Sequence, residues 1–254
     1  MIRGLACLAA LAAVLCATPA AAQTFRLEYQ ATAYGLFSFG RASIEANVAA
    51  GDYTANASLR TAGLAALVAK ARANAVSRGA FSEASGMAPA RYDLDHEHYG
   101  HRTSFVDWTQ PGVALGAAPI FRDRGNPPAS EEQRREGRDP LATLLTMGAQ
   151  VERTRRCDGV FRVFDGLYVY DLALRHIGEG RYRRGALDWP VIRCELSQRR
   201  IAGYASPEAL RKKDGGGELW FAIRPNAPFA IPVRVSSRLP LGVAAVSLSA
   251  FEED

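Results

Sequence analysis

The densest group of side chains that could do chemistry lies between Asp93 and His101, where three of the four histidines of the chain alternate with acidic residues. Histidine and carboxylate side chains are common zinc ligands and common general acids and bases. A zinc-protease helix requires a second histidine four positions after the first, with a glutamate beside the first. Here His96 and Glu97 are followed by glycine at position 100, so the motif fails by one residue.

The same residues have a second interpretation if the segment is extended. Side chains two positions apart share one face of a strand, so His96 and His98 could then bind a metal ion together. Tyr99 and Gly100, however, are typical of a turn between two strands. We therefore expect a plain hairpin and no metal site at His96, His98 and His101.

The glycine-containing motifs of common enzymes are incomplete. Gly112 and Gly116 have the spacing of a Gly-x-Ser-x-Gly nucleophile elbow but enclose no serine. Gly178 and Gly180 lack the third glycine of a phosphate-binding loop, and we place them between strands. We expect no catalytic residue of these kinds and no cofactor.

Asp165 lies close in the sequence to Asp171 and to two tyrosines, a composition that could hold a pair of acids. The next residue, Gly166, favours another interpretation. Asp-Gly between two strand-like runs is an ordinary signal of a hairpin turn. We expect a turn there and no catalytic role for Asp165.

Residues 1–22 have the composition of a cleaved secretory signal. Arg3 precedes an apolar run from Leu5 to Ala17, and the segment ends in three alanines that suit a signal peptidase. We therefore expect a mature protein that begins at Gln23 and resides in the periplasm. No later apolar run approaches the roughly 20 residues that cross a bilayer, so we expect no membrane span after cleavage.

Cleavage would remove Cys7 and Cys16 and leave Cys157 and Cys194 in the mature chain. Two thiols in an exported protein are expected to pair in an oxidising compartment. The two cysteines also flank a block of predicted strands that would bring them to neighbouring positions. We expect a disulfide between them, which removes the free thiol that a catalytic cysteine requires.

The composition argues against a nucleic-acid partner. The chain has 254 residues and a formal net charge of +5 at neutral pH. Removing residues 1–22 takes away one charged residue, Arg3, and leaves 232 residues with 30 basic and 26 acidic side chains, a net charge of +4. This charge is small, and its basic clusters are interrupted by acids, apolar residues or turns. The length suits a single β-rich domain, residues 23–254, that buries its own core.

Most of the chain after residue 22 alternates between apolar and polar residues in short runs. In the first run, Phe25, Leu27 and Tyr29 would share one face, as in a strand with one buried side. The number of such runs predicts an all-β fold, with a large curled antiparallel sheet or open barrel and one or two short helices. The later predicted strands are Arg91–Glu97, His101–Trp108, Val160–Phe164, Leu167–His176, Val191–Ile201, Glu218–Ile223, Ile231–Ser237 and Val243–Ala250.

Three segments depart from this alternation. The alanine-rich segment Leu64–Ala75 has apolar residues at helical spacing, although the next strand could begin at Asn74. A second helix is marked by Asp139, which can cap it, and by Pro140 at its first position. Before this helix, the charged and proline-rich segment Ile120–Arg138 predicts a mobile loop.

Three short motifs, taken in order along the chain, resemble a known family. They are Leu59-Arg60-Thr61-Ala62-Gly63-Leu64, Asp139-Pro140-Leu141, and Arg162-Val163-Phe164-Asp165-Gly166 followed by Tyr170-Asp171-Leu172. With a cysteine before the Phe-Asp-Gly run and another in a later strand, they resemble the proteobacterial exported family known as domain of unknown function 3108. The resemblance covers roughly residues 25–250. It implies an exported β-rich envelope protein and carries over no catalytic residues, because the family has no established reaction.

These observations favour a non-enzymatic periplasmic binding or scaffolding protein that supports the cell envelope. Its partner would be a lipid or other apolar ligand, or a peptide of an envelope protein. The strands Leu167–His176 and Val191–Ile201 are expected to curl with the aromatic run near Trp220 around an apolar cavity lined by Ala222.

Two other function classes stay open at this point. A periplasmic hydrolase would use a non-standard site near Asp93, His96 and His98, and these side chains should then converge in a cleft. A structural partner of an envelope complex would instead show an exposed apolar patch without a cavity.

Overall fold

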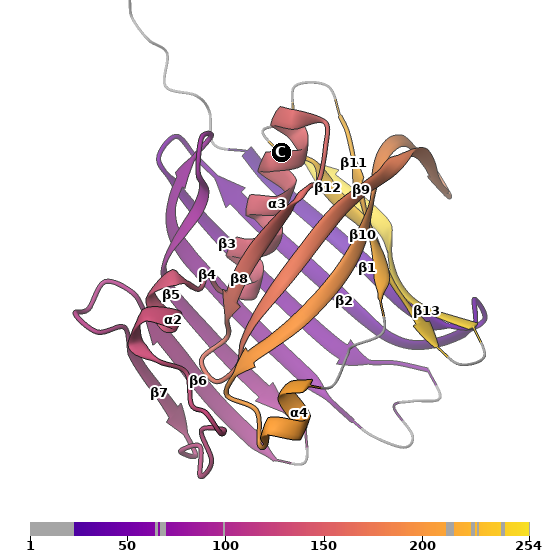
Figure 1. Ribbon diagram of the computed structural model, residues 1–254. Helices are drawn as coiled ribbons and strands as arrows, with labels where there is room; N and C mark the ends of the chain where they lie inside the picture. Colours follow the sequence, from indigo (N-terminus) through magenta and orange to yellow (C-terminus); the bar gives the residue numbers. More distant parts are fainter. Residues whose placement is uncertain are drawn as a thin grey trace, which may run out of the picture.

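The computed structural model describes residues 23–63, 66, 70–98, 100–211, 216–224, 227, 229–239 and 242–253. Thirteen strands in this part of the chain form one antiparallel sheet in the order β7-β6-β5-β4-β3-β2-β1-β13-β12-β11-β10-β9-β8. The sheet curls strongly without closing, because β7 and β8 lie at its two edges (Figure 1). The prediction of an all-β fold with a large curled antiparallel sheet is confirmed. The predicted signal segment, residues 1–22, lies outside the described residues.

The strands and helices have the following bounds. The first half of the sheet contains β1 (Gln23–Ala33), β2 (Phe37–Val48), β3 (Asp52–Thr61), β4 (Arg72–Ser82), β5 (Gly86–Glu97), β6 (His101–Asp107) and β7 (Ala114–Ala118). The second half contains β8 (Gly159–Phe164), β9 (Val169–Arg184), β10 (Leu187–Ala202), β11 (Gly217–Ala222), β12 (Ile231–Leu239) and β13 (Gly242–Glu253). The helices are α2 (Glu131–Glu136), α3 (Pro140–Thr154) and α4 (Pro207–Arg211).

Three local predictions differ from the structure. Strand β4 begins at Arg72, so the predicted helix cannot extend to Ala75; residues 64, 65 and 67–69 lie outside the described part. Pairing with β3 and β5 outweighs the high helix propensity of alanine there, because propensity differences are small compared with tertiary contacts. Part of the predicted mobile loop is helix α2, fixed by a capping box between Ser130 and Gln133. Gly178 and Gly180 lie within the long strand β9, not between strands.

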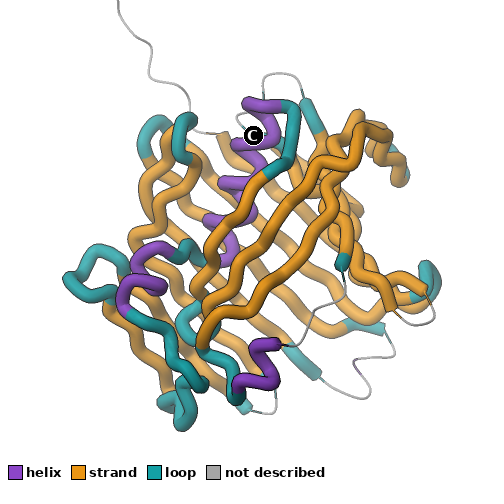
Figure 2. The backbone as a smooth tube through the Cα atoms, viewed as in Figure 1, coloured by secondary structure: helices purple, strands orange, loops and turns teal. Residues whose placement is uncertain are grey.

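Helix α3 lies inside the curl of the sheet, with the two halves of the sheet on opposite sides of it (Figures 1 and 2). On one side, Leu145 packs with Phe25 and Tyr53 of the first half. On the other side, Val151 packs with Phe221 of the second half. The predicted helix is therefore present, and it is the element that fills the open barrel.

The interior beyond α3 is filled by side chains of the sheet itself. Ala222 has no exposed surface and packs in a cluster with Leu27, Tyr29 and Ile231. Trp189 lies at the border of the same cluster. Ala222 therefore does not line the apolar cavity that the sequence predicted, because strands of both halves meet there in direct contact.

The start of α3 is held by a chain of buried hydroxyl and carboxyl groups. Asp139 Oδ1 accepts hydrogen bonds from the backbone N–H groups of Leu141 and Ala142, both at 2.9 Å. Ser77 Oγ donates to Asp139 Oδ2 at 2.7 Å and lies 2.8 Å from the hydroxyl of Tyr53. Burial raises the pKa of Asp139 to about 6. The helix is thus tied through its cap to strands β3 and β4.

We expect Ala222→Trp to destabilise the protein, because an indole has no space in this packed cluster. Overpacking of a core costs typically about 1–3 kcal/mol, so the urea midpoint of unfolding should fall. Ala80→Trp, at an exposed position of β4, is the matched control and should leave the midpoint near that of the wild type. An unchanged midpoint for Ala222→Trp would reveal unfilled space at this position.

The raised pKa of Asp139 makes stability depend on pH. The unfolded carboxyl titrates near 3.8, so between about pH 4 and pH 6 the folded state holds a proton that the unfolded state has released. The free energy of unfolding contributed by Asp139 therefore decreases as the pH rises through this window and is constant above it.

Asp139→Asn removes this titration but keeps a side chain that caps helices well. We expect the difference in unfolding free energy between wild type and variant to change by about 2–3 kcal/mol from pH 4 to pH 7, in the variant's favour at pH 7. Urea unfolding at several pH values measures this difference. Parallel pH profiles for the two proteins would contradict the assignment.

Candidate functional site

The side chains proposed for a hydrolase do not converge. Tyr92 of β5 is buried in the core, and the alternation of a strand places His96 on the same face as Tyr92 and Asp93 on the opposite, outer face. His98 follows the end of β5, in the turn before β6. Asp93 and His96 therefore lie on different sides of the sheet and cannot act on one substrate together.

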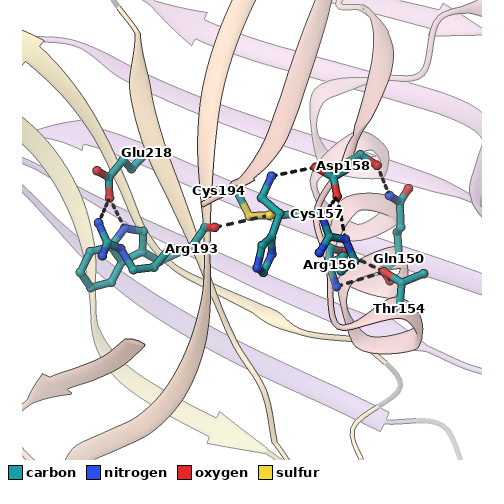
Figure 3. Close-up of a disulfide and its surroundings, with 10 residues drawn as sticks. Gln150, Thr154, Arg156, Cys157, Asp158, Arg193, Cys194 and Glu218 are labelled. Atoms are coloured by element: carbon teal, nitrogen blue, oxygen red, sulfur yellow. Dashed lines mark hydrogen bonds and ion pairs between the residues drawn. A yellow bond between two sulfur atoms is a disulfide. The ribbon is translucent and has the colours of Figure 1, made fainter. Parts of the chain in front are cut away.

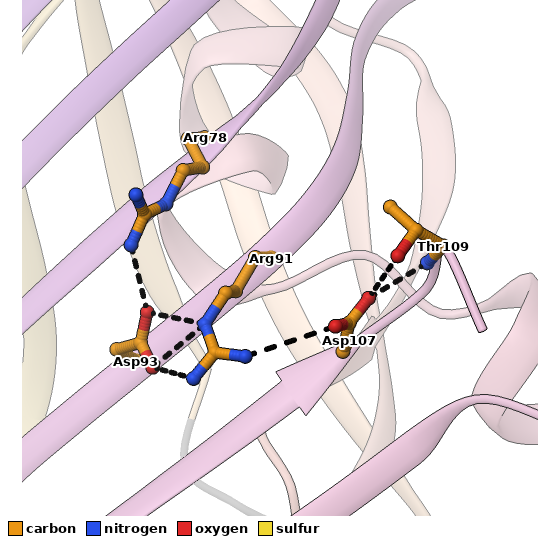
Figure 4. A network of polar contacts seen from close by, with 5 residues as sticks. All are labelled: Arg78, Arg91, Asp93, Asp107 and Thr109. Carbon is orange, nitrogen blue, oxygen red and sulfur yellow. Dashed lines mark hydrogen bonds and ion pairs between the residues drawn. The ribbon is translucent and has the colours of Figure 1, made fainter.

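Asp93 belongs to a network of charges on the outer face (Figure 4). It accepts hydrogen bonds from Arg91 at 2.6 and 2.9 Å and from Arg78 at 3.2 Å. Arg91 also lies 3.7 Å from Asp107, which accepts hydrogen bonds from Thr109. The hydrogen bonds from Arg91 and Arg78 hold the pKa of Asp93 below its usual value. The carboxylate is therefore an ion-pair partner and unsuited to donate a proton at neutral pH.

His98 and His101 have local partners, whereas the Nδ1 atom of His96 is buried without a hydrogen-bond partner. The predicted hairpin between β5 and β6 is present, and His98 N donates to Gly100 O in its turn at 3.1 Å. His101 Nε2 lies 2.8 Å from Asp95 Oδ1 across the two strands. Within the described residues, no group of three histidine, cysteine or acidic side chains is placed to hold a metal ion.

Asp165 and Asp171 have separate roles. Asp165 lies in the turn between β8 and β9, as its sequence predicts, and accepts hydrogen bonds from the following backbone N–H groups at 2.8 and 3.0 Å. Its burial raises its pKa. Asp171 pairs with Arg162 and Arg199, each at 2.6 Å. Burial acts to raise the pKa of Asp171, but the hydrogen bonds from the two arginines outweigh it and lower the pKa.

Cys157 and Cys194 are joined by a disulfide, with Cα atoms 6.0 Å apart (Figure 3). Both residues have no exposed surface. The bond ties the segment that follows α3 to strand β10. Next to it, Gln150 Nε2 donates to the carbonyl of Asp158 at 2.7 Å, and a carboxylate oxygen of Asp158 accepts from the backbone N–H of His176 at 2.9 Å. Neither sulfur is available as a nucleophile.

A hollow of about 560 Å³ lies on the outer face of β4 to β7. Val76, Asp93, Phe105 and Gly116 are successive cross-strand neighbours in it. A Cβ atom on Gly116 would lie 2.5 Å from the ring of Phe105, so glycine leaves the space that the ring occupies. The guanidinium of Arg91 lies 4.6 Å from the centre of the same ring. The other residues of the hollow are Asn74, Leu94, Asp95, Thr103, Ser104, Ala117 and Ala118.

No sequence motif marks this hollow, because its residues come from four strands. One signal was available in the predicted strand that begins at His101. Because Val106 lies in the core, the alternation of a strand places the neighbouring Phe105 on the solvent face. A large apolar side chain at such a position indicates a candidate contact surface.

Comparisons with known proteins show a likeness of fold. No family model matches the chain, and no curated protein matches it. The chain is similar to the crystal structure of a beta-barrel-like protein of domain of unknown function DUF1849 from Brucella abortus, with a TM-score of 0.53 and 9% identity over 91% of this chain and 98% of that chain. A protein from Parabacteroides distasonis described as a "putative lipoprotein" gives a TM-score of 0.34 and 8% identity over 90% of this chain and 94% of that chain. The fold is thus shared with a domain of unknown function, but not specifically with family 3108, which the motifs resemble.

Proposed function

We propose that the protein is a non-enzymatic, exported binding or scaffolding protein of the cell envelope, with a cleaved signal at residues 1–22 and a single periplasmic domain at 23–254. The disulfide between Cys157 and Cys194 supports export, because such bonds persist in oxidising compartments. The motif resemblance to the exported family 3108 supports the same location. None of the described helices is both long and apolar enough to span a bilayer.

The observation that carries the binding role is the hollow around Val76 and Phe105. Because the interior of the curled sheet is filled by α3 and by core side chains, a ligand binds on the outer face. Val76 and Phe105 supply apolar side chains to this hollow, Asp93 lies between them in the cross-strand row, and the guanidinium of Arg91 lies over the Phe105 ring. The chemistry suits an acyl chain or similar apolar group of an amphiphile, which gains roughly 25 cal/mol per Å² removed from water. An envelope-protein peptide is the competing occupant.

Val76→Lys should weaken the binding of a fluorescent acyl probe on the order of tenfold, because it removes the burial of a valine and places a charge in the hollow. The new ammonium would lie opposite Asp93, so the fold should be kept. Val160→Lys is the matched control, since Val160 is 67% exposed on β8 and outside the hollow. Fluorescence titration with thermal melts measures the effect. Absence of probe binding by the wild type, or equal loss in both variants, would refute the acyl site.

Export has a separate test. We expect protein recovered from the periplasm of a bacterial host to begin at Gln23 and to gain the mass of two hydrogen atoms on reduction, as Cys157 and Cys194 separate. Intact mass spectrometry with and without reductant measures both. A Cys157→Ala, Cys194→Ala double variant should show no change on reduction. Retention of residues 1–22, or two free thiols in the wild type, would contradict the expectation.

A further inference from the structure

Exposed apolar side chains gather at one end of the sheet, where β1 turns into β2. Leu36 is 82% exposed in this turn, and Phe37 is 57% exposed at the start of β2. The turn lies beside the start of β13, because Tyr34 N donates to Val243 O at 2.9 Å. We name as the apolar tip the residues Tyr34, Leu36, Phe37, Phe39 and Val243, which are five of the ten exposed large apolar side chains of the described residues. Such a concentration differs from the single scattered residues of an ordinary surface.

A row of arginines crosses the outer face beside the apolar tip. Arg41 of β2, Arg60 of β3 and Arg72 of β4 are direct cross-strand neighbours. Like charges in such positions destabilise a sheet. Arg72 has an acidic partner, Glu97, at 2.9 Å, whereas Arg41 and Arg60 form no ion pair with any described residue. Since Arg41 follows Phe37 by four residues, it lies about 13 Å from it along the strand.

The unpaired arginines of this row differ from the arginines farther along the same face, which have acidic partners. There, Arg26 pairs with Glu45 at 2.9 Å, and Arg78 pairs with Asp93 at 3.2 Å. The unpaired arginines are therefore a local feature, and the face as a whole neutralises its charges.

The arginine row lines a hollow of about 710 Å³ that also contains hydroxyl groups. Ser43 and Ser58 belong to the next cross-strand row, with their Oγ atoms 2.8 Å apart. Glu28 is the acidic residue of this lining, so the three arginines leave the hollow with a positive charge. Guanidinium groups beside hydroxyl donors match the oxygen atoms of a phosphate group.

We propose that this end of the sheet docks on the surface of a membrane that contains anionic phospholipids. The apolar tip enters the boundary between head groups and acyl chains, and Arg41 and Arg60 bind lipid phosphates. Both features point to this one occupant. A soluble anion would need the arginines but not the exposed tip, and an apolar protein partner would need the tip but not a row of like charges. The lining of this surface adjoins the hollow around Val76 at Asn74, and the inference goes beyond the proposed function because it concerns a different ligand and different residues.

Sedimentation with vesicles tests the inference. We expect the wild type to bind vesicles of phosphatidylcholine mixed with phosphatidylglycerol more tightly than vesicles of phosphatidylcholine alone, with release at raised salt. Arg41→Gln with Arg60→Gln should weaken binding to the anionic vesicles on the order of tenfold or more and reduce its salt dependence. Leu36→Ser with Phe37→Ser should weaken binding at least as much while salt dependence remains.

Matched controls separate this surface from general charge and apolarity. Arg122→Gln with Arg124→Gln removes two exposed arginines elsewhere, and Ile120→Ser removes an apolar side chain that is 73% exposed. Both should bind vesicles like the wild type, and thermal melts should show all variants folded. Every variant has the same N-terminus as the wild type. Vesicle binding through residues 1–22 would therefore persist in all of them, and a loss of binding in one variant cannot come from that segment.

Three results would overturn the inference. One is equal binding of the wild type to both kinds of vesicle. Another is unchanged vesicle binding in either double variant at the tip or the arginine row. The third is binding of inorganic phosphate that depends on Arg41 and Arg60 without any vesicle binding, which would assign these arginines to a soluble anion.

Discussion

The fold depends on one constraint: a sheet that curls without closing must have its interior filled. Helix α3 meets this need, because both halves of the sheet bury apolar side chains against it. Its position is fixed by the buried cap at Asp139, whose carboxylate satisfies two helix N–H groups and the hydroxyl of Ser77. A buried carboxylate is costly unless its hydrogen bonds are made. The cap therefore specifies where the helix enters the sheet as well as stabilising it.

An open sheet also has two edges, and an uncovered edge is a template for aggregation. At β8, the chain just before α3 covers the edge. Arg138 N donates to Arg162 O at 3.0 Å, and Phe164 N donates to Arg138 O at 2.8 Å. The side chain of Arg138 reaches across to the first half of the sheet, where its Nε donates to Met87 O at 2.8 Å. The segment that leads into α3 thus closes part of the seam that the strands leave open.

Local sequence signals predicted the strands and the start of α3, because alternation and the Asp-Pro cap depend on neighbouring residues. They did not predict that α3 occupies the interior, since this depends on contacts between residues far apart in the chain. Strand β9 extends beyond its predicted end through a β-bulge near Gly178, which alternation cannot reveal. The separation of Asp93 and His96, in contrast, was readable, because residues three positions apart on a strand face opposite sides. The arginine row could not be predicted from the sequence, because it depends on the pairing register of three strands.

A filled interior leaves the outer face as the place where this protein can recognise other molecules. Most of that face follows the rules of a stable sheet, with opposite charges on adjacent strands, as in Arg26 and Glu45. Arg41 and Arg60 break the rule, and the apolar tip breaks the preference for polar side chains in solvent, at the same end of the sheet. These features oppose stability of the isolated protein, while the helix and the disulfide supply stability elsewhere. Unfavourable features that coincide in one place are explained most simply by a partner that relieves both, and a bilayer surface with anionic head groups above an apolar layer has that composition.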